Sequence, residues 1–215
     1  SRGSTKGITP ATRDLGLVGY WKFDEGSGTT ANDSSGRGYN GVLSNSPIWT
    51  TGKIGNALDF SAASQNVTHD WNDFTVTQLT ISFWMNPDVV STGWRDLVGV
   101  ISAANGDWTR FHMNSTDNSI YWYGVYGSCS FGSNIVPTAG QWYYVVGTHD
   151  GAGTAKIYIN GELKNSCGSS GSSDTTAYLR VGSDSEVFDG KIDDVRIYNR
   201  ALSAAEIKAI YDATK

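Results

Sequence analysis

Few side chains in this 215-residue sequence are spaced for catalysis. Retaining glycoside hydrolysis needs two carboxyl groups about 5 to 5.5 Å apart. There are only four glutamates, and the nearest acidic pair, Asp184 and Glu186, falls in a predicted loop. The histidines have neither a nucleophile-activating nor a zinc-binding spacing. We expect each to lie on the surface or to be hydrogen-bonded in the core: His69, His112 and His149. The sequence argues against an enzyme.

Oxygen-bearing side chains gather where the first and last predicted strands should meet. Asp24 ends the first strand, Asp33 and Asn40 lie in a glycine-rich turn, and Asp193 is on the last strand. Calcium binds six to eight such oxygens, partly from backbone carbonyls. These residues predict a structural calcium ion that clasps the two strands. The alternative is that Asp24 and Asp33 accept hydrogen bonds from turn N–H groups, while Asp193 pairs with a basic residue of its own strand.

Aromatic residues give the best sign of a binding surface. Six lie within 33 residues, more ring area than one core layer needs: Trp94, Trp108, Tyr121, Trp122, Tyr123 and Tyr126. Indole and phenol rings stack on the C–H faces of sugars, and polar neighbours bind the hydroxyls. Asn105, Asp107 and Arg110 are such neighbours.

Alternation along a strand divides these rings between two faces. Either Tyr121 and Tyr123 or the set of Ile120, Trp122 and Tyr126 must point away from the core. The exposed set then either binds a ligand or is covered by long loops or a neighbouring subunit.

The cysteines and the charge indicate the cellular compartment and the classes of partner that the chain can have. Cys129 and Cys167 are the only cysteines, and each lies in a Gly/Ser-rich stretch rather than an apolar run. They predict one disulfide and an oxidising compartment, with two free thiols as the alternative. The net charge is −5 and the sequence has no block of like charges, so nucleic acid is not an expected partner. No apolar run is long enough for a membrane span in this chain.

Short alternating segments predict about ten to twelve strands. The clearest covers 79–86, where apolar and polar residues alternate. Asn160-Gly161 predicts a type I′ hairpin turn, since both positions need a positive φ. With 26 glycines, a helical bundle is excluded and a two-sheet sandwich is expected. The other predicted strands are 17–23, 97–101, 108–113, 120–126, 142–148, 155–160, 177–181 and 191–198.

One helix is expected, at the C-terminal end. Ser203 and Glu206 have the spacing of a capping box. The residues that follow place an apolar side against the sandwich, as a short lid: Ile207, Ile210 and Tyr211.

Several segments, taken in order, resemble the laminin-G-like jelly-roll family of the concanavalin A-like lectin/glucanase superfamily. The resemblance covers about residues 16 to 213. Its motifs are GYWKFDEGSG (19–28), DSSGRGYNG (33–41), GNALDF (55–60), LTISFWM (79–85), WYYV (142–145), YINGEL (158–163) and GKIDDVRIYNRAL (190–202).

This resemblance implies an all-β, two-sheet antiparallel jelly roll over residues 15–215. It implies core positions for Trp21, Trp84 and Trp142. Family members often hold a structural calcium near these motifs, and Asp193 stands where their Ile-Asp-x-Val-Arg pattern places its Asp. The Glu-x-Asp-x-Glu pattern of the catalytic relatives is missing from the sequence. The superfamily includes lectins, enzymes and adhesion modules, so fold alone does not decide function.

The expected function is a non-catalytic carbohydrate-binding (lectin) or adhesion module, extracellular or at the cell surface, with a structural calcium. The alternative is a structural subunit of a surface filament or pilus-like assembly. In that case residues 1–14, an aperiodic tail or linker, would self-associate by docking onto a neighbouring subunit.

Overall fold

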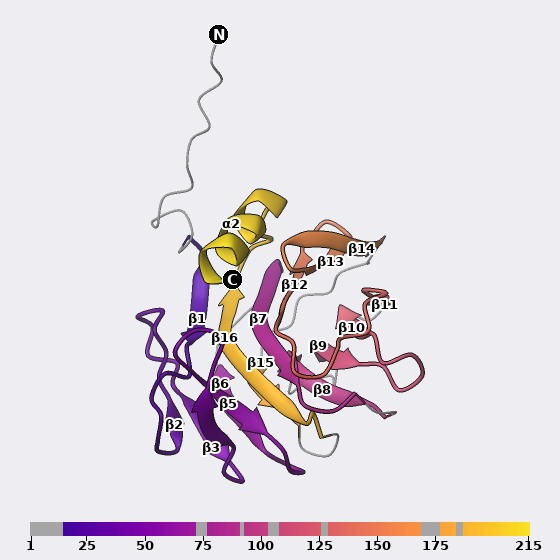
Figure 1. The fold of residues 1–215 in the computed structure, drawn as a ribbon. Helices are drawn as coiled ribbons and strands as arrows, with labels where there is room; N and C mark the ends of the chain where they lie inside the picture. Colours follow the sequence, from indigo (N-terminus) through magenta and orange to yellow (C-terminus); the bar gives the residue numbers. More distant parts are fainter. Residues whose placement is uncertain are drawn as a thin grey trace.

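The computed structural model describes residues 15–71, 77–90, 93–102, 108–125, 129–168, 177–183 and 187–215. Of residues 102, 108, 124, 125 and 129 it describes the backbone alone. The described chain forms two antiparallel sheets that face each other, with a helix at one end (Figure 1). Several predicted features lie outside the described part: the tail 1–14, Asn105, Asp107, Tyr126, Asp184, Glu186 and the side chains of Trp108 and Cys129.

The first sheet, here sheet A, runs in the order β14-β13-β12-β7-β16-β5-β4, and β1 pairs with β16 beyond the end of β5. The first and last strands therefore lie side by side, as expected. Its strands are β1 (Leu17–Trp21), β4 (Ile48–Thr51), β5 (Asn56–Phe60), β7 (Leu79–Pro87), β12 (Tyr143–His149), β13 (Thr154–Ile159), β14 (Glu162–Gly168) and β16 (Gly190–Tyr198).

The second sheet, sheet B, runs in the order β11-β10-β9-β8-β15-β6-β3-β2. Its strands are β2 (Thr30–Ala31), β3 (Gly41–Ser44), β6 (Asn66–Trp71), β8 (Arg95–Ser102), β9 (Trp108–Met113), β10 (Ile120–Val125), β11 (Cys129–Gly132) and β15 (Ala177–Gly182).

The predicted jelly-roll sandwich is confirmed, with more strands than expected. Every predicted strand is present with small shifts at its ends. The turn between β13 and β14 has a φ of 54° at Asn160 and 80° at Gly161, as a type I′ turn requires. The predicted ranges did not include β2, β3, β4, β5, β6 or β11. Four of these, β2, β3, β4 and β11, have only two to four residues, and runs this short cannot show a clear alternation.

Large rings fill the space between the sheets. Trp21, Phe83 and Phe111 are fully buried there, as is Trp122. The prediction that Trp122 is a ligand-binding ring is therefore wrong. Trp122 crosses the sandwich from β10 to the backbone of β12, where a Cβ at Gly147 would lie 0.7 Å from its Cζ3. Glycine on one sheet thus makes the room that the indole of the other sheet occupies.

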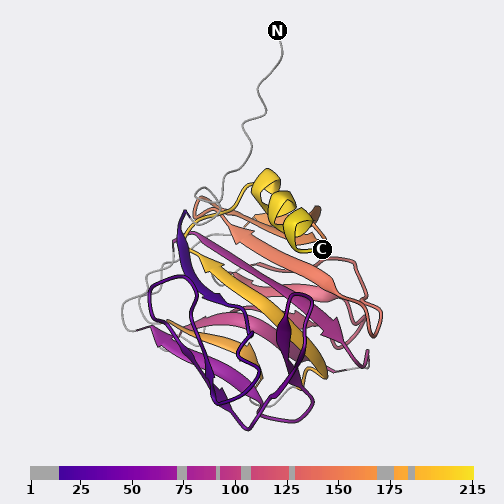
Figure 2. The same ribbon diagram turned by 60° about the vertical axis from the view of Figure 1, so that its left-hand side comes forward.

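The C-terminal helix α2 (Ala204–Thr214) covers the outer face of sheet A (Figure 2). The predicted capping box is present, because the Glu206 N–H donates to Ser203 Oγ and the Ser203 N–H donates to Glu206 Oε2. Under the helix a second apolar cluster contains Trp84, which is buried, and Trp142, which is only half-buried. No helix in the described chain is long and apolar enough to cross a membrane.

Candidate functional site

The outer face of sheet B carries the exposed aromatic residues. Phe111, Ile120 and Trp122 point into the core, so alternation turns Tyr121 and Tyr123 outward. Tyr121 is half-buried, and Tyr123 is 41% exposed. Of the two faces that the sequence left open, the structure selects the tyrosines.

Trp94 joins the two tyrosines around His112. The ring centroid of His112 lies 4.7 Å from that of Trp94, 5.8 Å from Tyr121 and 5.5 Å from Tyr123. Trp94 is 42% exposed. We call Trp94, Tyr121 and Tyr123 the aromatic platform.

His112 forms the buried base of this platform. It has no solvent exposure, and neither of its ring nitrogens has a hydrogen-bond partner in the described chain. Burial and the nearby Arg110 charge lower the pKa of His112 to about 3, so the ring is neutral at physiological pH. The prediction of a surface or hydrogen-bonded histidine is wrong here. It holds for the other two, since His69 Nδ1 lies 2.9 Å from the Asn40 carbonyl and His149 Nδ1 accepts the Gly151 N–H.

A row of charges runs across the strands beside the platform. Asp96 Oδ2 accepts from Arg110 Nη1 at 2.8 Å and from Arg180 Nη2 at 2.9 Å. Gly99 lies opposite Arg110 in the register, and a Cβ there would come within 2.8 Å of Arg110 Cβ. The guanidinium of Arg110 also stacks on Tyr123, 5.4 Å from the ring centroid. Arg110 is thus held in place between a carboxylate and a platform ring.

Neighbouring side chains fix the segment that presents Trp94. Arg95 is buried, and its Nη2 donates to Asn118 Oδ1 at 2.6 Å in the β9–β10 turn. Its Nε donates to the Gly93 carbonyl. The residues on either side of Trp94 are therefore tied to the strands that carry the tyrosines. Such a rigid array of rings with an oriented guanidinium suits stacking on an apolar face and hydrogen bonding to hydroxyls.

The four predicted calcium ligands do not come together. Asp33 Oδ1 accepts the N–H groups of Tyr20 and Ser35, and its Oδ2 accepts the Tyr39 N–H and the Ser35 hydroxyl. Burial alone would raise the pKa of Asp33, but these donors outweigh it and lower that pKa. Asn40 Oδ1 in turn accepts the Asp33 N–H. The alternative interpretation, a hydrogen-bonded turn, is the one observed.

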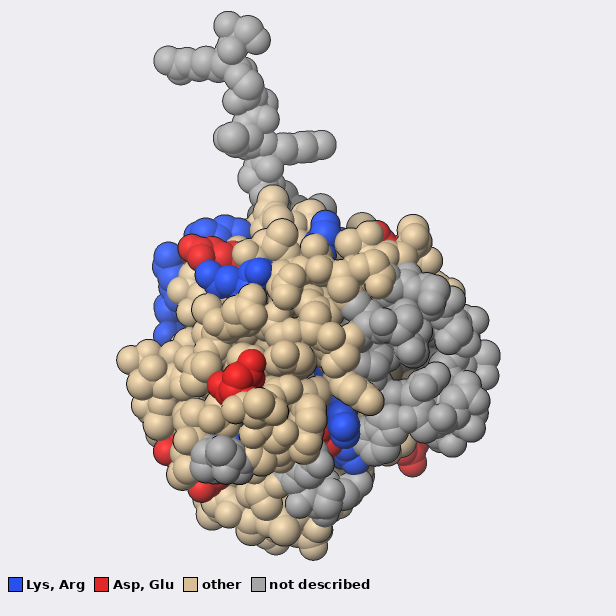
Figure 3. Space-filling model, turned by 90° about the vertical axis from the view of Figure 1, so that its right-hand side faces the viewer, with Lys and Arg blue, Asp and Glu red and all other residues tan. Residues whose placement is uncertain are grey.

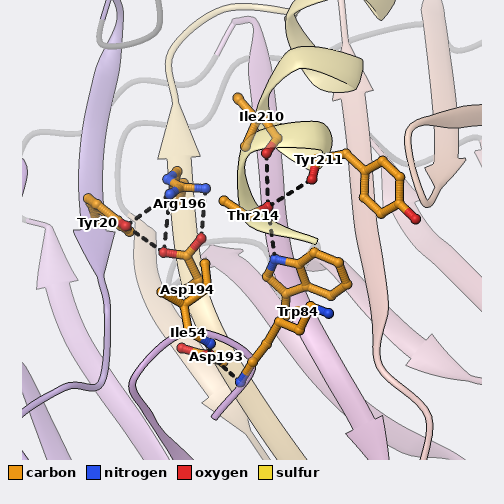
Figure 4. Close-up of polar contacts among 10 residues, drawn as sticks. Tyr20, Ile54, Trp84, Asp193, Asp194, Arg196, Ile210, Tyr211 and Thr214 are labelled. Atoms are coloured by element: carbon orange, nitrogen blue, oxygen red, sulfur yellow. Dashed lines mark hydrogen bonds and ion pairs between the residues drawn. The ribbon is translucent and has the colours of Figure 1, made fainter. Parts of the chain in front are cut away.

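Asp24 and Asp193 both accept hydrogen bonds from the hairpin that β4 and β5 form. Asp24 Oδ1 accepts the Asn56 N–H, and Asp193 Oδ2 accepts the N–H groups of Lys53 and Ile54 (Figure 4). The predicted four-residue site is therefore wrong. Among the described residues, no three acidic, histidine or cysteine side chains are placed to share a metal ion. In each of the four residues at least one side-chain oxygen accepts a backbone N–H, and whether the protein binds calcium elsewhere stays a prediction.

Asp193 is fully buried, and burial is the main reason that its pKa rises to about 7, against the two N–H donors. Its expected ion pair is made by Asp194 instead. A bulge in β16, with a φ of 56° at Asp194, turns that carboxylate toward Arg196 and the hydroxyl of Tyr20 (Figure 4). Arg196 also lies 4.3 Å from the Tyr20 ring centroid. This buried group joins β1 to β16 through hydrogen bonds and an ion pair.

Of the two cysteines in the predicted disulfide, the structure describes the side chain of Cys167 alone. Cys167 on β14 has no free thiol. Since the side chain of Cys129 lies outside the described part, the Cys129–Cys167 pairing stays a prediction.

Three functional candidates escaped the sequence reasoning: Asp96, His112 and Arg180. His112 shares a strand face with Arg110 two residues earlier, so period-2 alternation could have found it. Asp96 and Arg180 could not be found in this way. A register irregularity in β8 sets the position of Asp96, and Arg180 is 84 residues away in the sequence.

Comparisons with known proteins agree with this architecture. A family model described as the concanavalin A-like lectin/glucanases superfamily matches residues 60–208. Botulinum neurotoxin type G of Clostridium botulinum is 26% identical over 208 aligned residues, which cover 83% of this chain and 16% of the toxin. The chain therefore spans only a small part of that relative.

Solved structures share the fold at low identity. The binding domain of Paraclostridial Mosquitocidal Protein 1 has a TM-score of 0.77 at 16% identity, covering 94% of this chain and 53% of that one. Domain 4 of AbnA, an extracellular arabinanase of Geobacillus stearothermophilus in complex with arabinotriose, has a TM-score of 0.72 at 22% identity, covering 93% and 98%. Trypanosoma rangeli sialidase has a TM-score of 0.71 at 15% identity, covering 92% and 32%.

Proposed function

Because the chain belongs to the concanavalin A-like lectin/glucanases superfamily, we propose that it is a non-catalytic module that binds carbohydrate on the outer face of sheet B. The observation that carries the proposal is the aromatic platform. Two of its rings, Trp94 and Tyr123, are each about two-fifths exposed while they pack around one buried histidine.

The platform matches the chemistry of a sugar. Its rings offer flat apolar faces for the C–H side of a pyranose or furanose. Arg110, stacked on the Tyr123 ring, supplies N–H donors beside the platform, and Asp96 fixes their direction. Asp96 holds both Arg110 and Arg180 in ion pairs, so the guanidinium N–H donors keep a fixed direction toward ligand hydroxyl groups.

The comparisons supply the first ligand to try and support an extracellular location. Domain 4 of the arabinanase is an extracellular enzyme's domain in complex with arabinotriose, and the similarity covers nearly its whole length. Arabino-oligosaccharides are therefore the first probe for this chain. An oxidised Cys167 also fits an extracellular setting.

Titration calorimetry against arabinotriose and a panel of neutral oligosaccharides tests the proposal. We expect at least one ligand to bind, and Trp94→Ala or Tyr123→Ala to weaken it up to about tenfold, because one stacked ring contributes about 0.5 to 1.5 kcal/mol. Leu163→Ala is the matched control, since Leu163 is 53% exposed on β14 of the other sheet. A panel without a single bound sugar would refute the function. Equal effects of all three variants would refute the platform.

A further inference from the structure

A concave surface lies between α2 and strands β12–β14, on a different sheet from the platform. It is a groove of about 440 Å³, within the range of about 300 to 1,000 Å³ that small ligands occupy. Ile135, Tyr143 and Ile159 contribute apolar lining, and Tyr211 adds a second ring from the helix. Figure 4 shows Tyr211 projecting sideways from α2 toward the neighbouring strands.

Backbone packing and hydrogen bonds hold the residues that line this groove in place. The β13–β14 turn packs on the helix so closely that a Cβ at Gly161 would lie 3.0 Å from Lys208 Cδ and 3.2 Å from Tyr211 Cδ1. The Tyr143 hydroxyl accepts the Thr138 N–H and donates to Gln141 Oε1, which fixes the ring. The groove is therefore present before any ligand arrives.

Two lysines and one glutamate also line the groove. Lys164 Nζ donates to Glu162 Oε2 at 2.8 Å, and Lys208 acts on the same carboxylate through its charge. Lys208 Nζ also lies 5.7 Å from the Tyr211 ring centroid and donates to Asp212. Figure 3 shows basic and acidic side chains gathered near the top of this side of the molecule, at the height of α2 in Figure 1, above a mostly uncharged surface. The lining itself carries one more positive than negative charge, although the whole chain is acidic.

We propose that this groove binds a sugar ring that carries a carboxylate, with the ring against Tyr143 and Tyr211 and the carboxylate near Lys164 and Lys208. The two tyrosine rings in the lining favour a saccharide over an acidic peptide, because a pyranose presents a flat C–H face and a Glu or Asp side chain does not. Glu162 holds Lys164, and Asp212 holds Lys208, until a ligand carboxylate replaces them. The site is independent of the platform proposed above.

NMR titration of the full chain with methyl β-D-glucuronide tests the inference, with methyl β-D-glucoside as the neutral counterpart. We expect only the glucuronide to shift resonances of the groove residues. Lys208→Gln should weaken it about twofold to fivefold, the range of an exposed ion pair. Glu162→Gln should strengthen it by a similar factor, since it removes the competing carboxylate. Lys22→Gln is the matched control, because Lys22 is exposed and lies 5.5 Å from the Tyr20 ring centroid.

Trp94→Ala separates the two sites, and glucuronide binding should be unchanged in it. Three results would overturn the inference: no saturable binding of the glucuronide, equal binding of the neutral glucoside, or no opposite effects of Glu162→Gln and Lys208→Gln. Binding of a short poly-glutamate peptide at the groove in place of the glucuronide would also overturn it. Loss of glucuronide binding in Trp94→Ala would place the acidic sugar on the platform instead.

Discussion

Replacing Gly147 with alanine tests the packing that decides which aromatic residues are free to bind. The added Cβ would lie 0.7 Å from Trp122 Cζ3 and 1.2 Å from its Cε3. Carbon atoms pack at about 3.5 to 4.0 Å, so the indole must move by about 3 Å. It has no room to do so, because Phe111 packs on it with ring centroids 4.6 Å apart.

The expected cost follows from this geometry. Overpacking a core costs about 1 to 3 kcal/mol, and a displacement of this size belongs at the upper end. Alanine recovers about 0.4 to 1 kcal/mol by restricting the unfolded chain. We therefore expect Gly147→Ala to lower the free energy of unfolding by about 1.5 to 2.5 kcal/mol.

Urea unfolding followed by circular dichroism measures the effect. Gly168→Ala is the control, since among the described residues the nearest atom to its added Cβ is 4.0 Å away, and we expect a change below about 0.5 kcal/mol. Combining Gly147→Ala with Trp122→Leu should cost less than the sum of the two single changes, by at least about 1 kcal/mol. Wild-type stability in Gly147→Ala, or strict additivity in the pair, would show that Trp122 does not pack on β12.

Three other perturbations test two buried polar side chains and the predicted calcium site. His112→Phe should cost less than about 1 kcal/mol in urea unfolding, because it removes two ring nitrogens that lack partners in the described chain; a loss of about 3 kcal/mol would reveal a satisfied histidine. With the pKa of Asp193 near 7 when folded and 3.8 in its ordinary state, the folded chain holds the proton more tightly. Stability should therefore fall as pH rises from about 4 to 7, by up to about 4 kcal/mol, and then level off. Asp193→Asn should abolish this difference between unfolding at pH 4.5 and 7.5, whereas an unchanged slope would assign it to other groups. Chelation should leave the melting temperature unchanged, since the predicted calcium ligands do not come together in the described chain; a lower melting temperature would establish a calcium site made of other residues.

Local patterns predicted most of the fold. Alternation located the long strands, the Asn160-Gly161 pair located a hairpin, and the Ser203–Glu206 spacing located the start of α2. Each of these signals lies within a few residues of the feature that it specifies. For that reason each one is readable without knowledge of the partners in space.

The candidate site depends on contacts that no local pattern records. In the run from Tyr121 to Tyr123 every residue is aromatic, so hydrophobicity could not say which ring faces inward. Gly147 decides it from the opposite sheet. Likewise, the bulge in β16 gives the ion pair with Arg196 to Asp194 instead of Asp193. The Ile-Asp-Asp-Val-Arg run contains no signal that predicts this bulge.

The placement of α2 explains why the two outer faces differ. A sheet face that carries large rings must be covered, or it remains available to a ligand or partner. Sheet A has Trp84, Tyr144 and Tyr198 on its outer face, and all three are buried where α2 packs. On sheet B the platform rings Trp94 and Tyr123 stay partly exposed, so the described chain supplies no equivalent cover. In the described chain one outer face is therefore covered for stability, and the other is the face on which we propose that carbohydrate binds.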